Sequence, residues 1–285
     1  MSVFFYKKVC EIIFLFLICI NLTKCIPMKK LFYLFAFLTV ILSSCSGSTS
    51  EENTTTPILI TKITREINSV IYTIDFVYNG TKLATETTSN GLVKHYTYTG
   101  NYITYIETKN SSNTTTYETF VEYNSNNKIS KIINLNHTSS NPIYAGTKKE
   151  YTYNSNGTIS LMVYTGTITE QNQFGYKSIF YTDSQGQIIK YEDKNINDEI
   201  ISSYEYTHDI KKSPFINVVG FNQFLFDYFN NSYSEKNNVI SSNDILWGSY
   251  SSSCSYSYNS SDFPITNTFT DSNGSVRNYQ YLYNQ

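Results

Sequence analysis

The residue types that most often carry out chemistry are sparse in this 285-residue chain and form no known motif. His95, His137 and His208 lie far apart and match no HExxH-like spacing, so we expect no metal site. Two Asp-containing stretches, 183–186 and 271–274, look like fragments of calcium loops but lack the other carboxylates. The sequence has no Gly-x-Ser-x-Gly elbow and no phosphate-binding glycine loop. We therefore expect no catalytic, cofactor-binding or metal-binding residues, although paired carboxylates from separate strands would leave no signal in the spacing.

One cysteine is placed for attachment of a lipid. From Met28 the chain reads MKKLFYLFAFLTVILSSC, with two lysines, an apolar run from Leu31 to Leu42, and small residues before Cys45. The apolar run has the length of a signal-peptide core and is shorter than the ~20 residues that a spanning helix needs. Leu42-Ser43-Ser44-Cys45 resembles the bacterial lipobox. This resemblance implies that the Cys45 thiol receives diacylglycerol and tethers the mature chain to a membrane.

These signals divide the chain into four segments. We predict a signal peptide at 28–44, a polar flexible tether at 45–57, and a single domain at 58–285. Residues 1–27 contain a second apolar run, Ile12 to Ile20. We interpret them as an upstream segment produced by a misassigned start at Met1, with Met28 as the true start. A genuine helical anchor is the alternative.

The residues after Cys45 bear on the location of the protein. Ser46 rather than Asp follows the cysteine, which under lipoprotein sorting rules implies the outer membrane. Glu51-Glu52 is similar to the acidic export signals of Bacteroidota surface lipoproteins, so both the periplasmic and the surface face stay open. Of the other cysteines, Cys254 alone lies in the mature domain, and we expect a small packed residue rather than a nucleophile.

Charge argues against nucleic acid as a partner. Residues 1–44 hold five lysines and one glutamate, so the mature chain keeps 16 basic and 22 acidic residues. A net-acidic domain without a basic run lacks the charge that phosphate backbones require. The 27 tyrosines and 18 phenylalanines, against one tryptophan, favour strands, although AT-rich codons account for part of this bias.

The mature chain repeats one phrase: an alternating aromatic run that ends in tyrosine, a polar turn, and an alternating apolar run. The tyrosines nearest the turns are residues 78, 98, 123, 153, 181, 206 and 258, at intervals of 20 to 30 residues except for a final one of 52. A period of that length holds two strands and two turns, so each unit is predicted to be a hairpin. Asn79-Gly80, Asn156-Gly157 and Asn273-Gly274 supply the positive φ that such turns require.

Alternation places tyrosines in pairs on single strand faces. A cross-strand aromatic ladder that holds the sheet together is the leading interpretation. The alternative is a platform of amphipathic rings for a sugar or another flat ligand. The candidate ligand-contacting residues are Tyr96, Tyr98, Tyr151, Tyr153, Tyr204, Tyr206, Tyr256 and Tyr258.

One stretch, residues 211–232, breaks the rhythm of the repeats. Phe221, Phe224, Leu225 and Tyr228 fall at helical spacing and Pro214 interrupts the preceding strand. We expect a short helix or ordered loop near 215–230 that covers an open end or edge of the sheet. A ligand-gating lid formed by these four residues, within 215–229, is the alternative.

The fold class that these patterns predict is all-β. We expect an antiparallel meander of 14 to 18 short strands, forming either a closed water-soluble barrel or a strongly curved, twisted sheet. A transmembrane pore is disfavoured, because Lys94, Glu107, Lys131 and Lys190 interrupt the strand-like runs and the last residue is not aromatic.

Two resemblances extend across residues 58–285. The Tyr-Asn/Thr-x-x-Gly-x-Ile phrase resembles the tyrosine/aspartate repeats of bacterial cell-surface and Rhs-type shell proteins, with Asn or Thr at several Asp positions. Together with the lipobox, the segments 211–215 and 236–239 are similar to a family of Bacteroidota lipoproteins of unknown function with a porin-like fold. Ser213 stands where that family's pattern has Asn. The resemblance implies a fold and no activity.

The function predicted from these features is a membrane-tethered, non-enzymatic binding or scaffold lipoprotein of the cell envelope, with a glycan or protein ligand. We expect no cofactor and a monomeric chain. A carrier of a lipid or another apolar ligand, with a lid at 215–229, is the alternative. A hydrolase on the same β scaffold is the third candidate.

Overall fold

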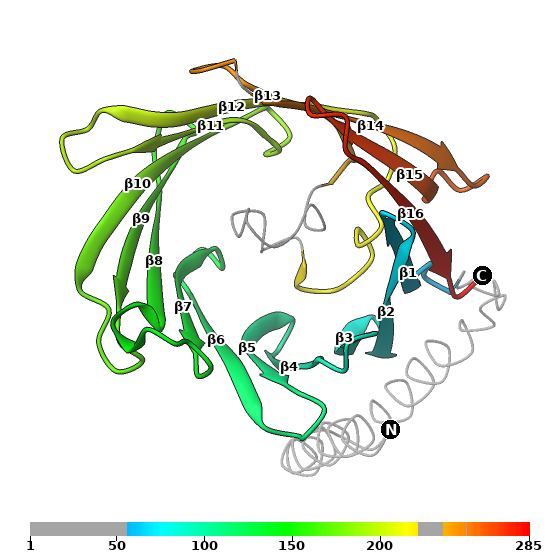
Figure 1. The fold of residues 1–285 in the computed structure, drawn as a ribbon, viewed down its shortest axis with the longest axis horizontal. Coiled ribbons are helices and arrows are strands. Elements are labelled where there is room, and N and C mark those ends of the chain that lie inside the picture. Colours follow the sequence, from blue (N-terminus) through cyan, green and yellow to red (C-terminus); the bar gives the residue numbers. More distant parts are fainter. Residues whose placement is uncertain (1–55, 222–235, 249) are drawn as a thin grey trace, which may run out of the picture. The chain divides into compact units, whose positions relative to one another are not determined.

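The computed structural model describes residues 56–221, 236–248 and 250–285, and within them lie sixteen strands. Every strand pairs antiparallel with its neighbours in sequence, and β1 also pairs with β16 (Figure 1). The predicted all-β meander is therefore confirmed, and of the two predicted forms the chain adopts the closed barrel. The strands are β1 (Ile60–Ile67), β2 (Val70–Asn79), β3 (Lys82–Thr88), β4 (Val93–Thr99), β5 (Tyr102–Lys109), β6 (Thr115–Tyr123), β7 (Ile129–Asn136), β8 (Gly146–Tyr153), β9 (Ile159–Gly166), β10 (Gln173–Thr182), β11 (Ile188–Lys194), β12 (Ile200–His208), β13 (Val239–Asp244), β14 (Ser251–Tyr258), β15 (Pro264–Asp271) and β16 (Val276–Tyr283).

A 3-10 helix at Pro142–Tyr144 lies between β7 and β8, and the described residues are otherwise almost entirely strands, turns and loops. None of the helices described there is long and apolar enough to cross a membrane. The predicted upstream segment, the signal peptide, Cys45 and most of the predicted tether lie outside the described residues.

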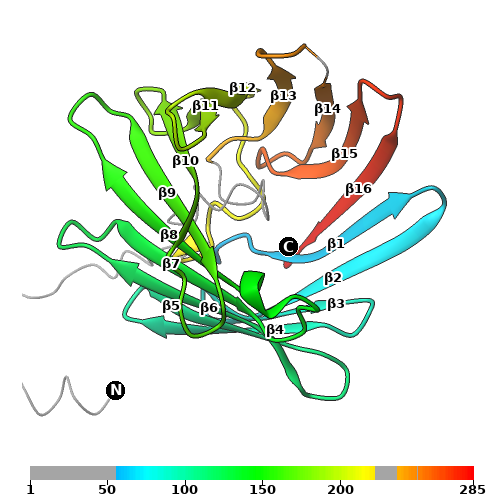
Figure 2. The same ribbon diagram turned by 60° about the vertical axis from the view of Figure 1, so that its left-hand side comes forward.

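The barrel closes where its first and last strands meet. Ile63 of β1 lies opposite Tyr281 of β16, and the register continues along both strands. Beyond the strands, the Leu59 amide donates to Asn284 Oδ1 at 2.9 Å and the Asn284 amide donates to the Leu59 carbonyl at 3.0 Å. Figure 2 shows β1, β2 and β16 side by side. Closure leaves no unpaired edge between the first and last strands, which removes the hazard of edge-to-edge association there.

The two ends of the barrel differ. At the end that we call the termini end lie residues 56–59, residues 284–285 and the long connection from β12 to β13. At the other end, here the hairpin end, lie the turns that join β1 to β2, β3 to β4, and each later odd-numbered strand to the even-numbered strand after it.

The polar phrases of the repeat form turns that a side-chain carboxylate or amide closes. Asn124 Oδ1 accepts from the amides of Asn126 at 2.9 Å and Lys128 at 3.1 Å. Asp183 Oδ1 accepts in the same way from Gln185 and Gln187. The fourth residue of such a loop has positive φ, 83° at Gly157 and 78° at Gly274. The predicted role of the glycines is confirmed, and Asn or Asp at the first position supplies the other half of the turn.

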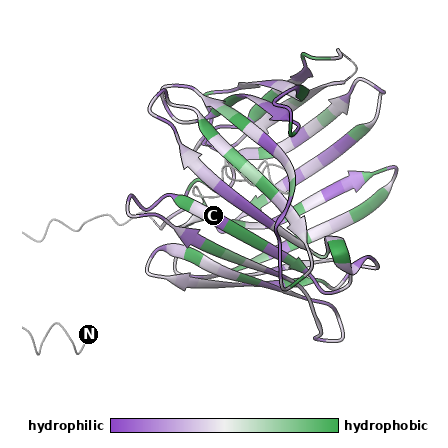
Figure 3. Ribbon diagram, turned by 90° about the vertical axis from the view of Figure 1, so that its left-hand side faces the viewer, coloured by the Kyte–Doolittle hydropathy of each residue, from purple (hydrophilic) through white to green (hydrophobic). Residues whose placement is uncertain are grey.

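Strand alternation gives the barrel two chemically different faces (Figure 3). The outer face carries cross-strand and same-strand ion pairs, among them Lys62–Asp75 at 3.0 Å, Lys131–Glu122 at 2.7 Å and Lys190–Glu192 at 2.9 Å. The same face also carries exposed apolar side chains, among them Val77 and Leu282. Four charged residues were taken from the sequence as evidence against a pore, and for Lys94 this was wrong. Lys94 points to the inner face, where its Nζ pairs with Glu86 at 3.1 Å.

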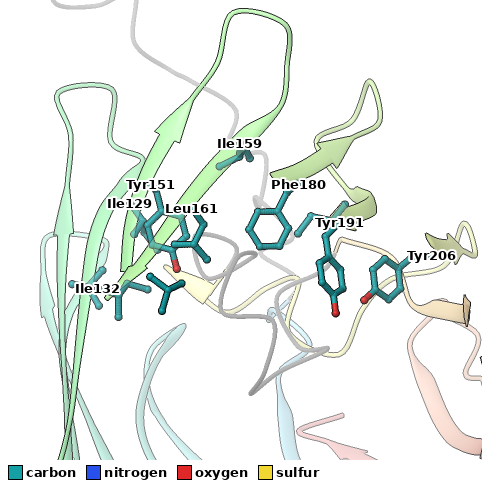
Figure 4. Packing of buried hydrophobic residues seen from close by; sticks show 11 residues of the cluster. Ile129, Ile132, Tyr151, Ile159, Leu161, Phe180, Tyr191 and Tyr206 are labelled. Carbon is teal, nitrogen blue, oxygen red and sulfur yellow. The ribbon is translucent and has the colours of Figure 1, made fainter. Parts of the chain in front are cut away.

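The inner face carries the hydrophobic core in two clusters. One cluster lines β6 to β12 with aliphatic and aromatic side chains that are at most 8% exposed (Figure 4). The other lies on β1 to β5 and β16 and includes Ile60, Ile63, Leu83 and Ile103, each at most 1% exposed. Water is excluded from both clusters, and this burial is the main favourable contribution to folding.

The second cluster includes part of the β12–β13 connection. Residues 209–221, which we call the inserted loop, pass inside the ring of strands (Figure 1, yellow). Phe215 packs edge-on against Phe76 with ring centroids 5.2 Å apart, and Phe221 stacks on Phe215 at 5.0 Å. Successive turns shape the loop, with the Val218 amide donating to the Phe215 carbonyl at 2.9 Å. An ordered segment was predicted near 215–230, and this is confirmed for residues 215–221, the part of it that the structure describes.

Candidate functional site

The eight candidate tyrosines all point toward the barrel interior, as the register with buried neighbours requires. Tyr151 and Tyr206 are buried, and the other six are half-buried. They come from β4, β8, β12 and β14, which are not adjacent, so the structure does not bring them into one row. Tyr206 lies near Tyr204, and the rings of Tyr256 and Tyr258 are 6.0 Å apart.

At the termini end, tyrosine hydroxyls form hydrogen bonds that join neighbouring hairpins. The Tyr123 hydroxyl donates to the Ile103 carbonyl at 2.8 Å, and the Tyr153 hydroxyl donates to the Ile129 carbonyl at 3.1 Å. Tyr256 reaches the Val239 carbonyl and Tyr283 reaches the Pro264 carbonyl in the same manner. Each bond spans about one repeat of the sequence, so the repeated tyrosine is a structural cross-link.

The predicted ladder of stacked tyrosines was wrong at this end. Across several turns a tyrosine lies opposite an aliphatic residue, as in Tyr98 with Ile103, Tyr123 with Ile129, and Tyr153 with Ile159. A β-bulge precedes Tyr98 and Tyr123. The hydroxyls of Tyr123 and Tyr153 reach the strand on the opposite side of their own. Alternating tyrosine and isoleucine fills this part of the barrel.

Nearer the hairpin end, the inner face of β11 to β14 combines tyrosine rings with carboxylates. The Tyr191 ring stacks on Tyr204, with centroids 5.4 Å apart and an interplanar angle of 14°. Tyr204 lies opposite Asp244 on β13, and Tyr250 stands edge-on to Tyr204 at 6.4 Å. Asp193 lies two residues beyond Tyr191 on the same face of β11. We call these five residues the acid-tyrosine wall.

The two acids of the wall have different partners. Asp244 Oδ1 accepts from the Leu246 and Trp247 amides at 3.0 and 3.1 Å, so this carboxylate caps the β13–β14 turn. Asp193 accepts from the Ser178 hydroxyl at 2.5 Å and has no cationic partner within ion-pair distance among the described residues. Burial raises the pKa of the Asp193 carboxyl above its usual value. Burial raises the pKa of Tyr204 as well, and the Asp244 carboxylate adds to that effect.

This arrangement is suited to bind a polyhydroxylated, flat ligand. Tyrosine rings offer a large rigid apolar surface, and their hydroxyls donate and accept hydrogen bonds. A carboxylate such as Asp193 has several acceptor positions, of which one is used by Ser178. A few placed polar groups beside apolar rings are typical of small-ligand sites. The described residues contain no group of three or more His, Cys, Asp or Glu side chains that could hold a metal ion.

Two of the hollows in the described part of the chain lie at the termini end. One, of about 510 Å³, is lined in part by Asp183, His208, Asp209 and Lys236. Its polar groups serve the inserted loop: Lys236 Nζ donates to Gln185 at 2.8 Å, and Asp209 accepts from the Asn238 amide at 3.0 Å. The other hollow, of about 310 Å³, lies between the inserted loop and the β4–β5 turn. These hollows border a structural anchor, so we place the candidate site on the wall instead.

The residues predicted as a lid are described only in part. Phe221 is 5% exposed and its ring centroid lies 5.9 Å from that of Tyr96. Phe224, Leu225 and Tyr228 lie outside the described residues. Phe221 is thus part of the core, and a gating role for this segment stays a prediction.

Sequence reasoning found one residue of the wall, Tyr204, and missed the other four. Tyr191 and Asp193 alternate on β11 and so share a face, which was a readable signal. Asp244 and Tyr250 border a turn that follows the long β12–β13 connection, where the repeat phrase is interrupted. Their approach to Tyr204 depends on the pairing of β12 with β13, which sequence spacing does not encode.

Comparisons with known proteins find similarity among solved structures. No protein-family model and no curated protein matches the sequence. Among solved structures, the chain is similar to a porin-like protein from Bacteroides uniformis ATCC 8492, with 11% sequence identity, coverage of 79% of this chain and 97% of that chain, and a TM-score of 0.35. So distant a likeness carries no argument, and the class of this protein rests on its own strand pairing: a closed, sixteen-stranded antiparallel β-barrel.

Proposed function

We propose that this chain is a membrane-tethered, non-enzymatic binding lipoprotein of the outer membrane, and that its ligand is a glycan held at the acid-tyrosine wall. The observation that carries the proposal is the half-buried Tyr204 ring beside Asp193, a carboxylate that lacks a cationic partner among the described residues. The rings would cover the apolar face of a sugar, and Asp193 would accept from its hydroxyls. Lipid on Cys45 would hold the chain at the membrane, as the lipobox implies.

The position of the wall supports a ligand that arrives from the hairpin end. The chain enters the barrel at the termini end, where Leu59 and Asn284 pair, and the inserted loop packs there as well. The tether from Cys45 to Thr56 spans at most about 40 Å when fully extended. A lipid on Cys45 would thus keep the termini end closer to its own membrane, and the hairpin end would be available to a soluble ligand.

A glycan-binding titration of the purified full-length chain tests this proposal. The probe is a neutral linear oligosaccharide, and the variant is Tyr204→Ala. Tyr181→Ala is the matched control, because Tyr181 lies on the outer face of β10 and donates to Glu192 at 3.0 Å. We expect Tyr204→Ala to weaken binding about tenfold, since an aromatic contact contributes up to roughly 1.5 kcal/mol, and Tyr181→Ala to leave it unchanged. Equal binding by both variants would contradict the proposal.

The carrier of an apolar ligand is the second candidate, favoured by the aliphatic inner face of β6 to β9. Val121, Ile129, Ile132 and Leu161 are at most 5% exposed there, so other protein atoms already cover them. Mass spectrometry of gently purified protein separates the candidates. A bound lipid in stoichiometric amount would favour the carrier over the glycan-binding protein.

A hydrolase is favoured by one observation, the raised pKa of Asp193. A general acid needs such a shift, but it also needs a second carboxylate across the scissile bond. Asp244, the nearest acid on the wall, accepts hydrogen bonds from the Leu246 and Trp247 amides and closes the β13–β14 turn. We therefore propose binding without turnover, and product analysis after prolonged incubation with the oligosaccharide tests for cleavage.

A further inference from the structure

The sequence contains two arginines, Arg65 and Arg277, and closure of the barrel brings them together. Arg65 lies on β1 opposite Tyr279 of β16, and Arg277 lies two residues before Tyr279 on the same face. Positions diagonal to each other across two strands are roughly 7–8 Å apart. The two guanidinium groups therefore belong to one patch of the inner face near the hairpin end, although 212 positions separate them in the chain.

Aromatic rings support both arginines. The Arg65 guanidinium lies over the Tyr279 ring, 5.9 Å from its centroid, and Tyr72 is its partner on the other side, on β2. The Arg277 guanidinium lies over the Phe269 ring at 4.9 Å. A guanidinium that stacks on a ring keeps its edge, with its fork of N–H donors, available for a planar acceptor. The Tyr72 side of the patch is accessible, since Tyr72 is 46% exposed.

Neither arginine has an ion-pair partner among the described residues, although carboxylates are common in the barrel. Arg65 Nε is buried and has no hydrogen-bond partner there. Lys94, another cation on the inner face, is by contrast neutralised by Glu86 at 3.1 Å. Asp271 is near the patch, but its Oδ1 accepts from the amides of Asn273 and Ser275 and closes the β15–β16 turn. An oxyanion from a ligand would pair with the outer guanidinium nitrogens of the half-buried Arg65 and of Arg277.

The patch is continuous with the acid-tyrosine wall. Burial and the Asp271 carboxylate raise the pKa of Tyr250, whereas the Arg277 guanidinium lowers it. Tyr250 is therefore close enough to both charged groups for each to act on its hydroxyl. The Tyr250 ring in turn stands edge-on to the Tyr204 ring, with the ring centroids 6.4 Å apart. From β13 to β16 there are three strand spacings of about 4.8 Å each. One extended oligomer can therefore contact the wall and the arginines together.

We propose that Arg65 and Arg277 form a subsite for an oxyanion on a sugar, so that the ligand class of this barrel is an acidic glycan. The inference rests on the proposed function and adds the charge of the ligand to it. A uronate carboxylate and a sulfate ester each present two charged oxygens on one atom, which a guanidinium fork can bind through two parallel hydrogen bonds. The aromatic rings of Tyr72 and Tyr279 flank the site and would cover the sugar ring that bears the oxyanion.

Calorimetric titration of the purified full-length chain tests this with three probes of equal length: an oligogalacturonide, a sulfated oligosaccharide and a neutral oligosaccharide. We expect at least one acidic probe to bind about tenfold or more tightly than the neutral one, and Arg65→Gln and Arg277→Gln each to remove most of that preference. Lys62→Gln is the matched control, because Lys62 carries the same charge on the outer face of β1 and pairs with Asp75. It is expected to leave the preference unchanged.

Other variants and probes distinguish the possible failures. Arg65→Lys keeps the charge without the fork, so partial loss is expected from it even if Arg65→Gln folds poorly. The two acidic probes show which oxyanion the site accepts. Acidic and neutral probes that bind equally, or arginine variants that retain the preference, would overturn the subsite. If the neutral probe still binds through Tyr204 in that case, the proposed function stands without it, whereas binding of no probe would remove both.

Discussion

The two halves of the barrel interior use the same strands for different purposes. On β4, Tyr98 near the termini end accepts from the Leu83 amide and donates to the inserted loop, whereas Lys94 nearer the hairpin end pairs with Glu86. On β16, Tyr283 near the termini end donates to the Pro264 carbonyl, whereas Arg277 has no ion-pair partner among the described residues. Near the termini end several tyrosine hydroxyls bond within the chain, although the Tyr78 and Ser213 hydroxyls are buried there without a hydrogen-bond partner among the described residues. Near the hairpin end, Arg65 and Arg277 lack ion-pair partners among those residues. We therefore propose that the termini half serves mainly the fold and the hairpin half mainly recognition.

The largest expected effect comes from removing the inserted loop's main contact with the termini half. Phe215→Ala deletes a ring that is 2% exposed and packs against Phe76 and Phe221. We expect a loss of about 3–5 kcal/mol in the free energy of unfolding, measured by urea denaturation. Tyr72→Ala, in the hairpin half, is the control and should cost less than about 1 kcal/mol because Tyr72 is 46% exposed. Similar losses from both variants would contradict the division of the interior.

Alkaline pH should also act on the termini half. Burial raises the pKa of Tyr98 and of Tyr153 from the ordinary 10.0 to about 12. A pKa that is higher in the folded state means that the neutral form is favoured there. The contribution to stability is therefore complete below pH 10 and is lost as the pH rises from about 10 through about 12. The measurement is the free energy of unfolding across this range, with phenolate absorbance as the readout of ionisation.

In Tyr98→Phe and Tyr153→Phe that alkaline loss should become smaller, because fewer buried phenols remain to ionise. An unchanged pH profile in both variants would show that other groups control the transition.

A smaller effect is expected from the hydroxyls that fasten neighbouring hairpins. Tyr123→Phe removes the bond to the Ile103 carbonyl and should lower the free energy of unfolding by about 0.5–1.5 kcal/mol. Tyr181→Phe, on the outer face, removes a bond to Glu192 and should cost less, since water can replace that bond more easily. Chemical denaturation of both variants compares them, and a larger cost for Tyr181→Phe would reverse the assignment of the structural tyrosines.

The smallest effect, and one of opposite sign, is expected at the acid-tyrosine wall. Burial raises the pKa of Asp193, so its charged form is disfavoured in the folded state. Its contribution to stability is present below the ordinary pKa of 3.8 and is lost as the pH rises through the raised value. Asp193→Asn should therefore be slightly more stable than the wild type at pH 7, with the difference vanishing below pH 3.8. The same variant should bind the neutral glycan less well.

Asp75→Asn on the outer face is the control for this substitution. It removes an exposed ion pair with Lys62, so stability at pH 7 should fall or stay unchanged rather than rise. An Asp193→Asn variant that is less stable than the wild type at pH 7 would show that the carboxylate serves the fold and not a ligand.

The sequence predicted the repeated hairpins because each one is specified locally. Alternation sets the face of every side chain, and residues such as Asn124 and Gly157 close the turns without help from distant parts of the chain. The lipobox-like segment at Cys45 is also a local pattern, and its role stays a prediction. Closure was not predictable, because the pairing of β1 with β16 depends on the accumulated twist and stagger of all the strands.

The candidate site was predictable only in part, for the same physical reason. Tyr204 was found because it belongs to an alternating run. The approach of Asp193, Asp244 and Tyr250 to it, and of Arg65 to Arg277, follows from strand pairing and closure. The repeat also misled: the tyrosines at the turns were read as one aromatic row, but Tyr98 and Tyr123, for example, lie opposite isoleucines across their turns.

The most direct test of the account is a disulfide across the seam between the first and last strands. Thr64 and Gln280 lie directly opposite each other on the outer face of β1 and β16. In a Cys254→Ser background, the double variant Thr64→Cys and Gln280→Cys should oxidise to an intramolecular disulfide, detected by mass spectrometry of the digested chain. The mispaired Thr64→Cys and Thr268→Cys should not, since Thr268 lies on β15. Failure of the opposed pair to cross-link in folded protein would show that the barrel does not close, and the shared site of Arg65 and Arg277 would be lost with it.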